Sequence, residues 1–146
     1  MKSSGLKIGV LAIVFSLFLI ADMALADGWP ASVAGTWTVI GANAEGTLTI
    51  TQSSGTSTST SKPIRGFIYN TDNIEGFYNP SSGRIAFIRF DRKTYVAKQF
   101  WSGNLTQSVT GKVLRIGGTL TVFRHNNITG TIGGSLGEYN FSAIKK

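Results

Sequence analysis

Few residues in this sequence could perform acid–base chemistry. His125 is the only histidine, and it falls in the polar segment 124–127, whose composition is typical of an exposed turn. Glu75 lies inside an expected strand, where its carboxylate would point away from the isoleucine before it. A glutamate base, a histidine acid and an arginine such as Arg89 to stabilise a phosphorane would suffice for a ribonuclease. A small basic secreted hydrolase is therefore one hypothesis, although the spacing does not itself bring the three residues together.

Thiol and metal chemistry have no support in the sequence. The chain has no cysteine, which excludes disulfides, thiolate zinc sites, cysteine nucleophiles and a lipoprotein anchor. No acidic residue beyond the leader stands at metal-ligand spacing from His125; these residues are Asp27, Glu45, Asp72, Glu75, Asp91 and Glu138. We expect a protein that is not an enzyme and carries no metal and no cofactor.

Aromatic residues favour a binding function instead. They make up 11% of the chain, and one face of the expected strand 94–107 carries Tyr95, Gln99 and Trp101. Aromatic walls with an occasional amide suit a cup for a small molecule, whereas an interior filled by side chains is the alternative. The sequence predicts four ligand-binding residues: Trp37, Tyr95, Gln99 and Trp101.

The elements that must position these side chains are strands. Beyond the leader, no window repeats apolar residues at helical spacing, whereas alternation such as Trp37-x-Val39 and Leu48-x-Ile50 recurs between turn signals. The expected strands are 35–41, 46–53, 63–70, 73–79, 84–91, 94–107, 112–124 and 137–145, with a weaker one at 127–132. Eight short strands joined by hairpin-length turns can close on themselves and leave no free edge. We expect an all-β fold, an antiparallel up-and-down β-barrel of about eight strands, forming a single domain over residues 27–146.

The first 26 of the 146 residues resemble a cleavable signal peptide. Lys2 and Lys7 precede an apolar run over 8–20, and Ala24-Leu25-Ala26 supplies the small residues that signal peptidase requires. The run is shorter than the ~20 residues of a membrane-spanning helix. We therefore expect bacterial export, with the mature protein in the periplasm or outside the cell.

Charge leaves the kind of partner open. The formal net charge is +7, and a basic stretch runs from Arg84 to Lys98. Such a stretch suits an anionic surface, including nucleic acid, or is a solvated basic face. A partner protein could also be held by the segment 51–61, which is almost entirely Ser, Thr and Gly, so a loop-mediated inhibitor or surface-interaction domain is a further hypothesis.

Two motifs carry a family resemblance. Gly35-Thr36-Trp37-Thr38 and Phe100-Trp101-Ser102-Gly103-Asn104 resemble the first strand and the Trp-Ser-Gly strand of the avidin and streptavidin family of secreted eight-stranded barrels. The resemblance implies a barrel that holds a small ligand in its interior. Where that family contacts biotin, this chain has Val39, Asn43, Gln99 and Leu120, which forfeits several of the hydrogen bonds that fix such a ligand. The leading hypothesis is a non-enzymatic secreted or periplasmic barrel that binds a different small molecule or a partner surface.

Overall fold

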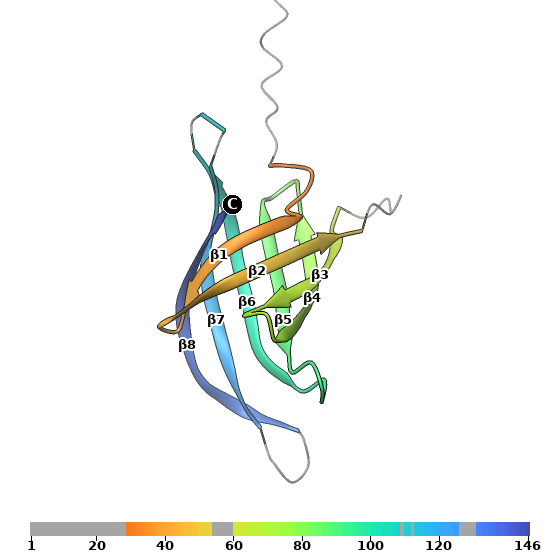
Figure 1. Ribbon diagram of the computed structural model, residues 1–146, viewed down its shortest axis with the longest axis vertical. Coiled ribbons are helices and arrows are strands. Elements are labelled where there is room, and N and C mark those ends of the chain that lie inside the picture. Colours follow the sequence, from red (N-terminus) through yellow and green to blue (C-terminus); the bar gives the residue numbers. More distant parts are fainter. Residues whose placement is uncertain (1–28, 54–59, 109, 112, 126–130) are drawn as a thin grey trace, which may run out of the picture.

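The computed structural model describes residues 29–53, 60–108, 110–111, 113–125 and 131–146, which form eight strands in a closed antiparallel barrel (Figure 1). The predicted all-β barrel is therefore confirmed, whereas the predicted leader over 1–26 and most of the weaker strand at 127–132 lie outside the described residues. The strands are β1 (Gly35–Gly41), β2 (Ala44–Gln52), β3 (Lys62–Ile68), β4 (Asp72–Asn79), β5 (Arg84–Phe90), β6 (Ala97–Gln107), β7 (Leu114–His125) and β8 (Ile132–Lys145). Among these residues no helix is long and apolar enough to cross a membrane.

Each strand pairs with the next, and β8 returns to β1. Closure is made by the pairs from Trp37 with Lys145 to Gly41 with Phe141. The β1–β2 hairpin turns at Ala42 and Asn43, whose φ angles of 50° and 62° are those of the two-residue turn that matches the twist of paired strands. Odd strands therefore end, and even strands begin, at the same rim of the barrel.

The opposite rim, where β1 begins, is closed by the segment before β1; we call it the plug end. Val33 is fully buried, and its carbonyl accepts a hydrogen bond of 3.1 Å from Trp37 Nε1. The Tyr78 hydroxyl donates to the carbonyl of Pro30 at 2.7 Å, and burial raises the pKa of Tyr78 to about 12. These contacts fix the entering chain across the end of the barrel.

Large side chains fill the interior between the two rims. Trp101 is fully buried, stacks on Phe87 with ring centroids 5.5 Å apart, and meets the Phe141 ring edge-on at 4.8 Å. Room for the indole comes from Gly41, where a Cβ would lie 3.1 Å from the Trp101 ring. The middle of the barrel is therefore packed core, which leaves the two rims as the places to look for a binding site.

Candidate functional site

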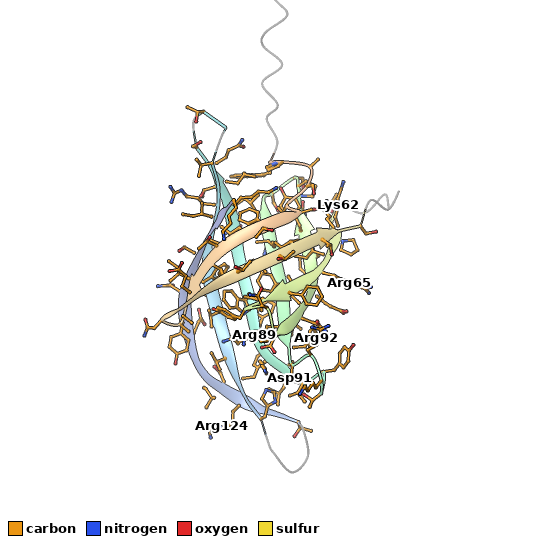
Figure 2. The ribbon with its side chains drawn as sticks, in the orientation of Figure 1. Lys62, Arg65, Arg89, Asp91, Arg92 and Arg124 are labelled. Atoms are coloured by element: carbon orange, nitrogen blue, oxygen red, sulfur yellow. The ribbon has the colours of Figure 1, made fainter. Side chains whose placement is uncertain are left out.

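The rim opposite the plug end is polar, and we call it the mouth. It is built from the start of β4, the end of β5, the start of β6 and the end of β7. Figure 2 shows Arg89, Asp91 and Arg92 gathered near this rim, with Arg124 on the β7 side of it. The topology of the barrel brings these segments together. Because neighbouring strands are antiparallel, each odd strand ends at this rim and the next strand begins there.

Asp72, the first residue of β4, is the centre of the mouth. Its residue is only 3% exposed, and Oδ2 accepts a hydrogen bond of 2.7 Å from Arg89 Nε while Arg89 Nη2 lies 2.6 Å from the same oxygen. Lys98 Nζ lies 3.1 Å from Oδ1. A buried carboxylate needs such compensation, because removing its charge from water is costly.

Lys98 extends this cluster to Asp91 in the β5–β6 loop. Its Nζ lies 2.9 Å from Asp91 Oδ2. The Lys98 hydrogen bond, supported by the backbone N–H groups of Thr94 and Lys93, holds the pKa of Asp91 well below its usual range. In turn, Asp91 and then Asp72 raise the pKa of Lys98, against the opposing effect of burial. Both charges are therefore firmly in place at neutral pH.

Gln99 links the ion cluster to the aromatic core. Its Oε1 accepts hydrogen bonds from Arg89 Nη1 at 3.0 Å and from Trp101 Nε1 at 3.1 Å. Arg89 also lies over the Tyr69 ring, with Cζ 4.8 Å from the centroid. The guanidinium is thus held by a carboxylate, an amide oxygen and a ring, which fixes its orientation.

Beside this cluster lies a recess of about 240 Å³, which we call the histidine recess. It is lined by Arg89, Lys98, Gln99, Val122, Phe123 and His125. Both ring nitrogens of His125 are shielded from solvent and have no hydrogen-bond partner among the described residues. The pairing of β7 with β8 shifts register at Val122/Phe123 and Phe123/His125, and such bulges re-aim side chains.

A second recess, of about 510 Å³, has the same two cations in its lining, and we call it the basic recess. It is lined by Asn70, Thr71, Asp72, Arg89, Asp91, Arg92, Lys93 and Lys98. Arg89 and Lys98 line both recesses, so the two recesses are neighbours at the mouth.

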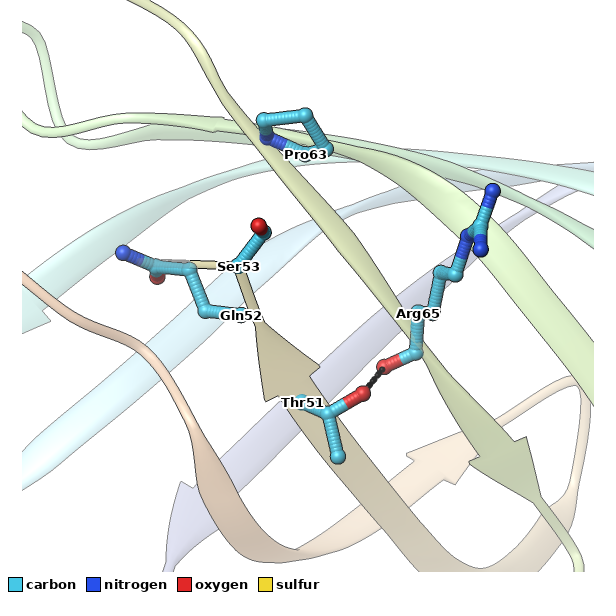
Figure 3. A pocket seen from close by; sticks show the side chains of 5 residues that line it. All are labelled: Thr51, Gln52, Ser53, Pro63 and Arg65. Carbon is cyan, nitrogen blue, oxygen red and sulfur yellow. Dashed lines mark hydrogen bonds between the residues drawn. The ribbon is translucent and has the colours of Figure 1, made fainter. Parts of the chain in front are cut away.

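A third recess, of about 520 Å³, lies at the ends of β2 and β3 that face the plug end (Figure 3). Two of its polar side chains are already used. Thr51 Oγ1 donates to the Arg65 carbonyl at 3.0 Å, and Gln52 Nε2 donates to the Ala31 carbonyl at 2.9 Å. We therefore place the candidate site at the mouth. The neighbouring residues 54–59, from the loop predicted to capture a partner, lie outside the described part of the chain.

The four predicted ligand residues occupy different places. Gln99 lines the histidine recess, and Trp101 is its buried hydrogen-bond partner. Trp37 is fully buried at the plug end, and Tyr95 lies in the β5–β6 loop, where the residue is 70% exposed. The strand predicted over 94–107 begins only at Ala97, so Tyr95 does not share the interior face.

The residues of the ribonuclease hypothesis are divided between two surfaces. Arg89 and His125 line one recess. Glu75 is on the outer wall, where its carboxylate lies 3.7 Å from Arg65 Nε and both side chains are more than half exposed. Among the described residues, no group of three His, Asp or Glu side chains is placed to hold a metal.

The sequence analysis missed Asp72, Val122 and Phe123. The sequence analysis names Asp72 only among the acidic residues without metal-ligand spacing. Asp72 is two residues before buried Ile74 and so faces the same side of β4, which was the available signal. Neither a protein-family model, nor a curated protein, nor a solved structure matches the chain.

Proposed function

We propose that this protein is a non-enzymatic binding barrel whose mouth holds a small molecule in the histidine recess. The observation that carries the proposal is that the two ring nitrogens of His125, which lines this recess, have no hydrogen-bond partner among the residues that the structure describes. A buried polar atom without a partner costs about 1–3 kcal/mol, so such an atom is rare unless something else completes it. Both nitrogens are shielded in the ligand-free protein, so a ligand that parts the wall of the recess and offers both a donor and an acceptor would complete the imidazole.

The polar side of the recess favours an oxygen-bearing ligand. Gln99 Oε1 is occupied by Arg89 and Trp101, which turns the amide nitrogen to other partners. The cations Arg89 and Lys98 add positive potential at the same wall. An oxygen of the ligand facing this wall would meet only donors.

The apolar side sets the size of the ligand. Val122 and Phe123 supply the hydrophobic lining, and Val122 packs directly on the core. A cavity of about 150 Å³ holds benzene, so about 240 Å³ accommodates one ring with a small polar substituent. Apolar walls with few convergent polar groups are typical of small-molecule sites. Export to the periplasm or beyond, expected from the leader, is part of the same proposal.

The test is titration of the purified protein with benzyl alcohol, benzamide and cyclohexanol, followed by calorimetry and saturation-transfer NMR. His125→Leu removes the unpartnered nitrogens at similar volume, and Arg124→Leu is the control on the neighbouring exposed residue. We expect His125→Leu to weaken binding about tenfold while leaving the ligand-free protein as stable as the parent or more so, because no orphaned group remains. Arg124→Leu should bind like the parent.

A second variant tests the space rather than the polarity. Val122→Phe fills the recess and should abolish binding with the His125 imidazole still present. The proposal fails if none of the three probes binds, or if both His125→Leu and Val122→Phe bind them as the parent does.

A further inference from the structure

The two recesses of the mouth share Arg89 and Lys98 in their linings, so a ligand that passes along these two side chains would reach both. We propose that the mouth is one bipartite site for a phosphate monoester of a small ring-bearing alcohol, with the ring in the histidine recess and the phosphate in the basic recess. This inference rests on the proposed function, because the ring occupies the recess already assigned.

The net charge of the basic recess is complementary to a dianion. Its lining holds four cations, Arg89, Arg92, Lys93 and Lys98, and two carboxylates. Asp72 and Asp91 form ion pairs with Arg89 and Lys98 and neutralise them. The recess therefore keeps an excess of two positive charges, on Arg92 and Lys93. A phosphate monoester carries about −1.5 to −2 at neutral pH, which matches that excess, whereas a carboxylate would neutralise only half of it.

Neither of the two excess cations is paired with a carboxylate among the described residues. Arg92 lies over the Phe67 ring, with Cζ 5.6 Å from the centroid, so its guanidinium is positioned but its charge is not neutralised. Lys93 contributes a second charge from the adjacent position. Asn70 and Thr71, from the β3–β4 turn, add amide and hydroxyl groups to the lining.

The loop that carries these cations is already ordered for binding. Asp91 Oδ1 accepts hydrogen bonds from the backbone N–H of Lys93 at 2.9 Å and of Thr94 at 3.0 Å. The Asp91 carbonyl accepts another from Tyr95 N–H at 2.9 Å, which holds Tyr95 at a φ of 55°, a conformation that aromatic residues rarely adopt. A loop fixed in this way loses little entropy when an anion binds.

The cluster of Asp72, Arg89, Asp91 and Lys98 would allow one ligand to be bound at both its ring and its phosphate. Arg89 faces the ring side through Gln99 and the phosphate side through Asp72, and Lys98 likewise lines both recesses. An ester oxygen between ring and phosphate would lie against these two cations. Free phosphate would lose the ring contacts, and a neutral alcohol would lose the contacts to Arg92 and Lys93.

The experiment compares phenyl phosphate, inorganic phosphate and benzyl alcohol by calorimetry, with phosphorus NMR for the two phosphates. The variant is Arg92→Gln/Lys93→Gln. Its control, Arg84→Gln/Arg115→Gln, removes the same charge from two exposed arginines near the plug end. We expect phenyl phosphate to bind the parent at least about tenfold more tightly than either other probe, and to lose about that factor in the variant but not in the control. Benzyl alcohol should bind all three proteins alike.

Each other outcome overturns a definite part. If benzyl alcohol binds and phenyl phosphate binds no tighter, the bipartite site is refuted while the proposed function stands. If inorganic phosphate binds as tightly as phenyl phosphate, the basic recess is an anion site alone and the inference fails. If no ring compound binds, the proposed function fails as well. If an oligonucleotide binds far more tightly than phenyl phosphate, and only Arg92→Gln/Lys93→Gln weakens it, the mouth is a nucleic-acid surface instead.

Discussion

Asp72→Asn is the substitution that most directly tests the structure of the mouth. Asparagine keeps the size of the side chain but removes the charge that Arg89 and Lys98 share. Arg89 is then left with its bonds to Gln99 and the Tyr69 ring, in a position where its side chain is only 18% exposed. An arginine this far from water has few other ways to stabilise its charge.

The expected loss of stability follows from the burial of Asp72 and Arg89, whose side chains are 5% and 18% exposed. Removing one partner of a fully buried ion pair costs about 3–5 kcal/mol. Lys98 is 36% exposed and keeps Asp91, so its share is screened, and we expect a loss of about 2–4 kcal/mol in the free energy of unfolding. For a domain of this size that loss lowers the melting temperature by roughly 8–16 °C.

Glu75→Gln is the matched control, because it also replaces a carboxylate on β4 by its amide. The Glu75 pair with Arg65 is 3.7 Å long and exposed, so its loss should cost under about 0.5 kcal/mol. Urea unfolding measures both variants, and Asp72→Leu/Arg89→Met should recover much of the stability that Asp72→Asn loses, since no unpaired buried charge remains. Equal losses for Asp72→Asn and Glu75→Gln would refute the reasoning.

Two further predictions concern packing and pH. Gly118→Ala should destabilise the barrel by about 2 kcal/mol or more, because the new Cβ would collide with the Ser102 carbonyl oxygen. Gly117→Ala is the control and should be tolerated, because its Cβ would meet no atom within contact distance. Thermal unfolding compares the two variants, and equal melting temperatures would contradict the packing. Asp91→Asn should be less stable than the parent at neutral pH, with a deficit that shrinks as the pH falls below about 4, because the unfolded carboxyl protonates there while the native one, held by Lys98, stays ionised to lower pH. A deficit that stays constant from about pH 7 to pH 2 in urea unfolding would argue against the Asp91–Lys98 bond.

The strands could be predicted because alternation is a local property. Leu48 and Ile50 face the core as expected, and so do Trp37 and Val39. The wrong strand boundaries are those set by a side-chain hydrogen bond or by an irregularity in strand pairing. The sixth strand starts three residues late because Asp91 holds the preceding loop, and β8 starts at Ile132 rather than near 137 because its pairing with β7 continues through two register shifts.

The site was harder to predict because it depends on closure of the barrel. Asp72 binds Arg89 and Lys98, which are 17 and 26 residues away, and no local pattern in the sequence indicates which carboxylate will meet which cation. His125 was expected in an exposed turn, since its neighbours are polar. Instead it ends β7, where its ring nitrogens are shielded.

The proposed binding function would account for the polarity of the mouth, which stability alone does not require. A buried ion pair is often no more stabilising than hydrophobic side chains of the same shape, and the plug end shows that this chain can close a rim with Val33 and Trp37. If stability were the only requirement, apolar side chains could close the mouth in the same way. Instead, buried Asp72 binds two cations that line both recesses, and the ring nitrogens of nearby His125 have no hydrogen-bond partner in the described part of the chain. Under the proposed function this arrangement would orient charge toward a ligand, which an apolar rim would not do.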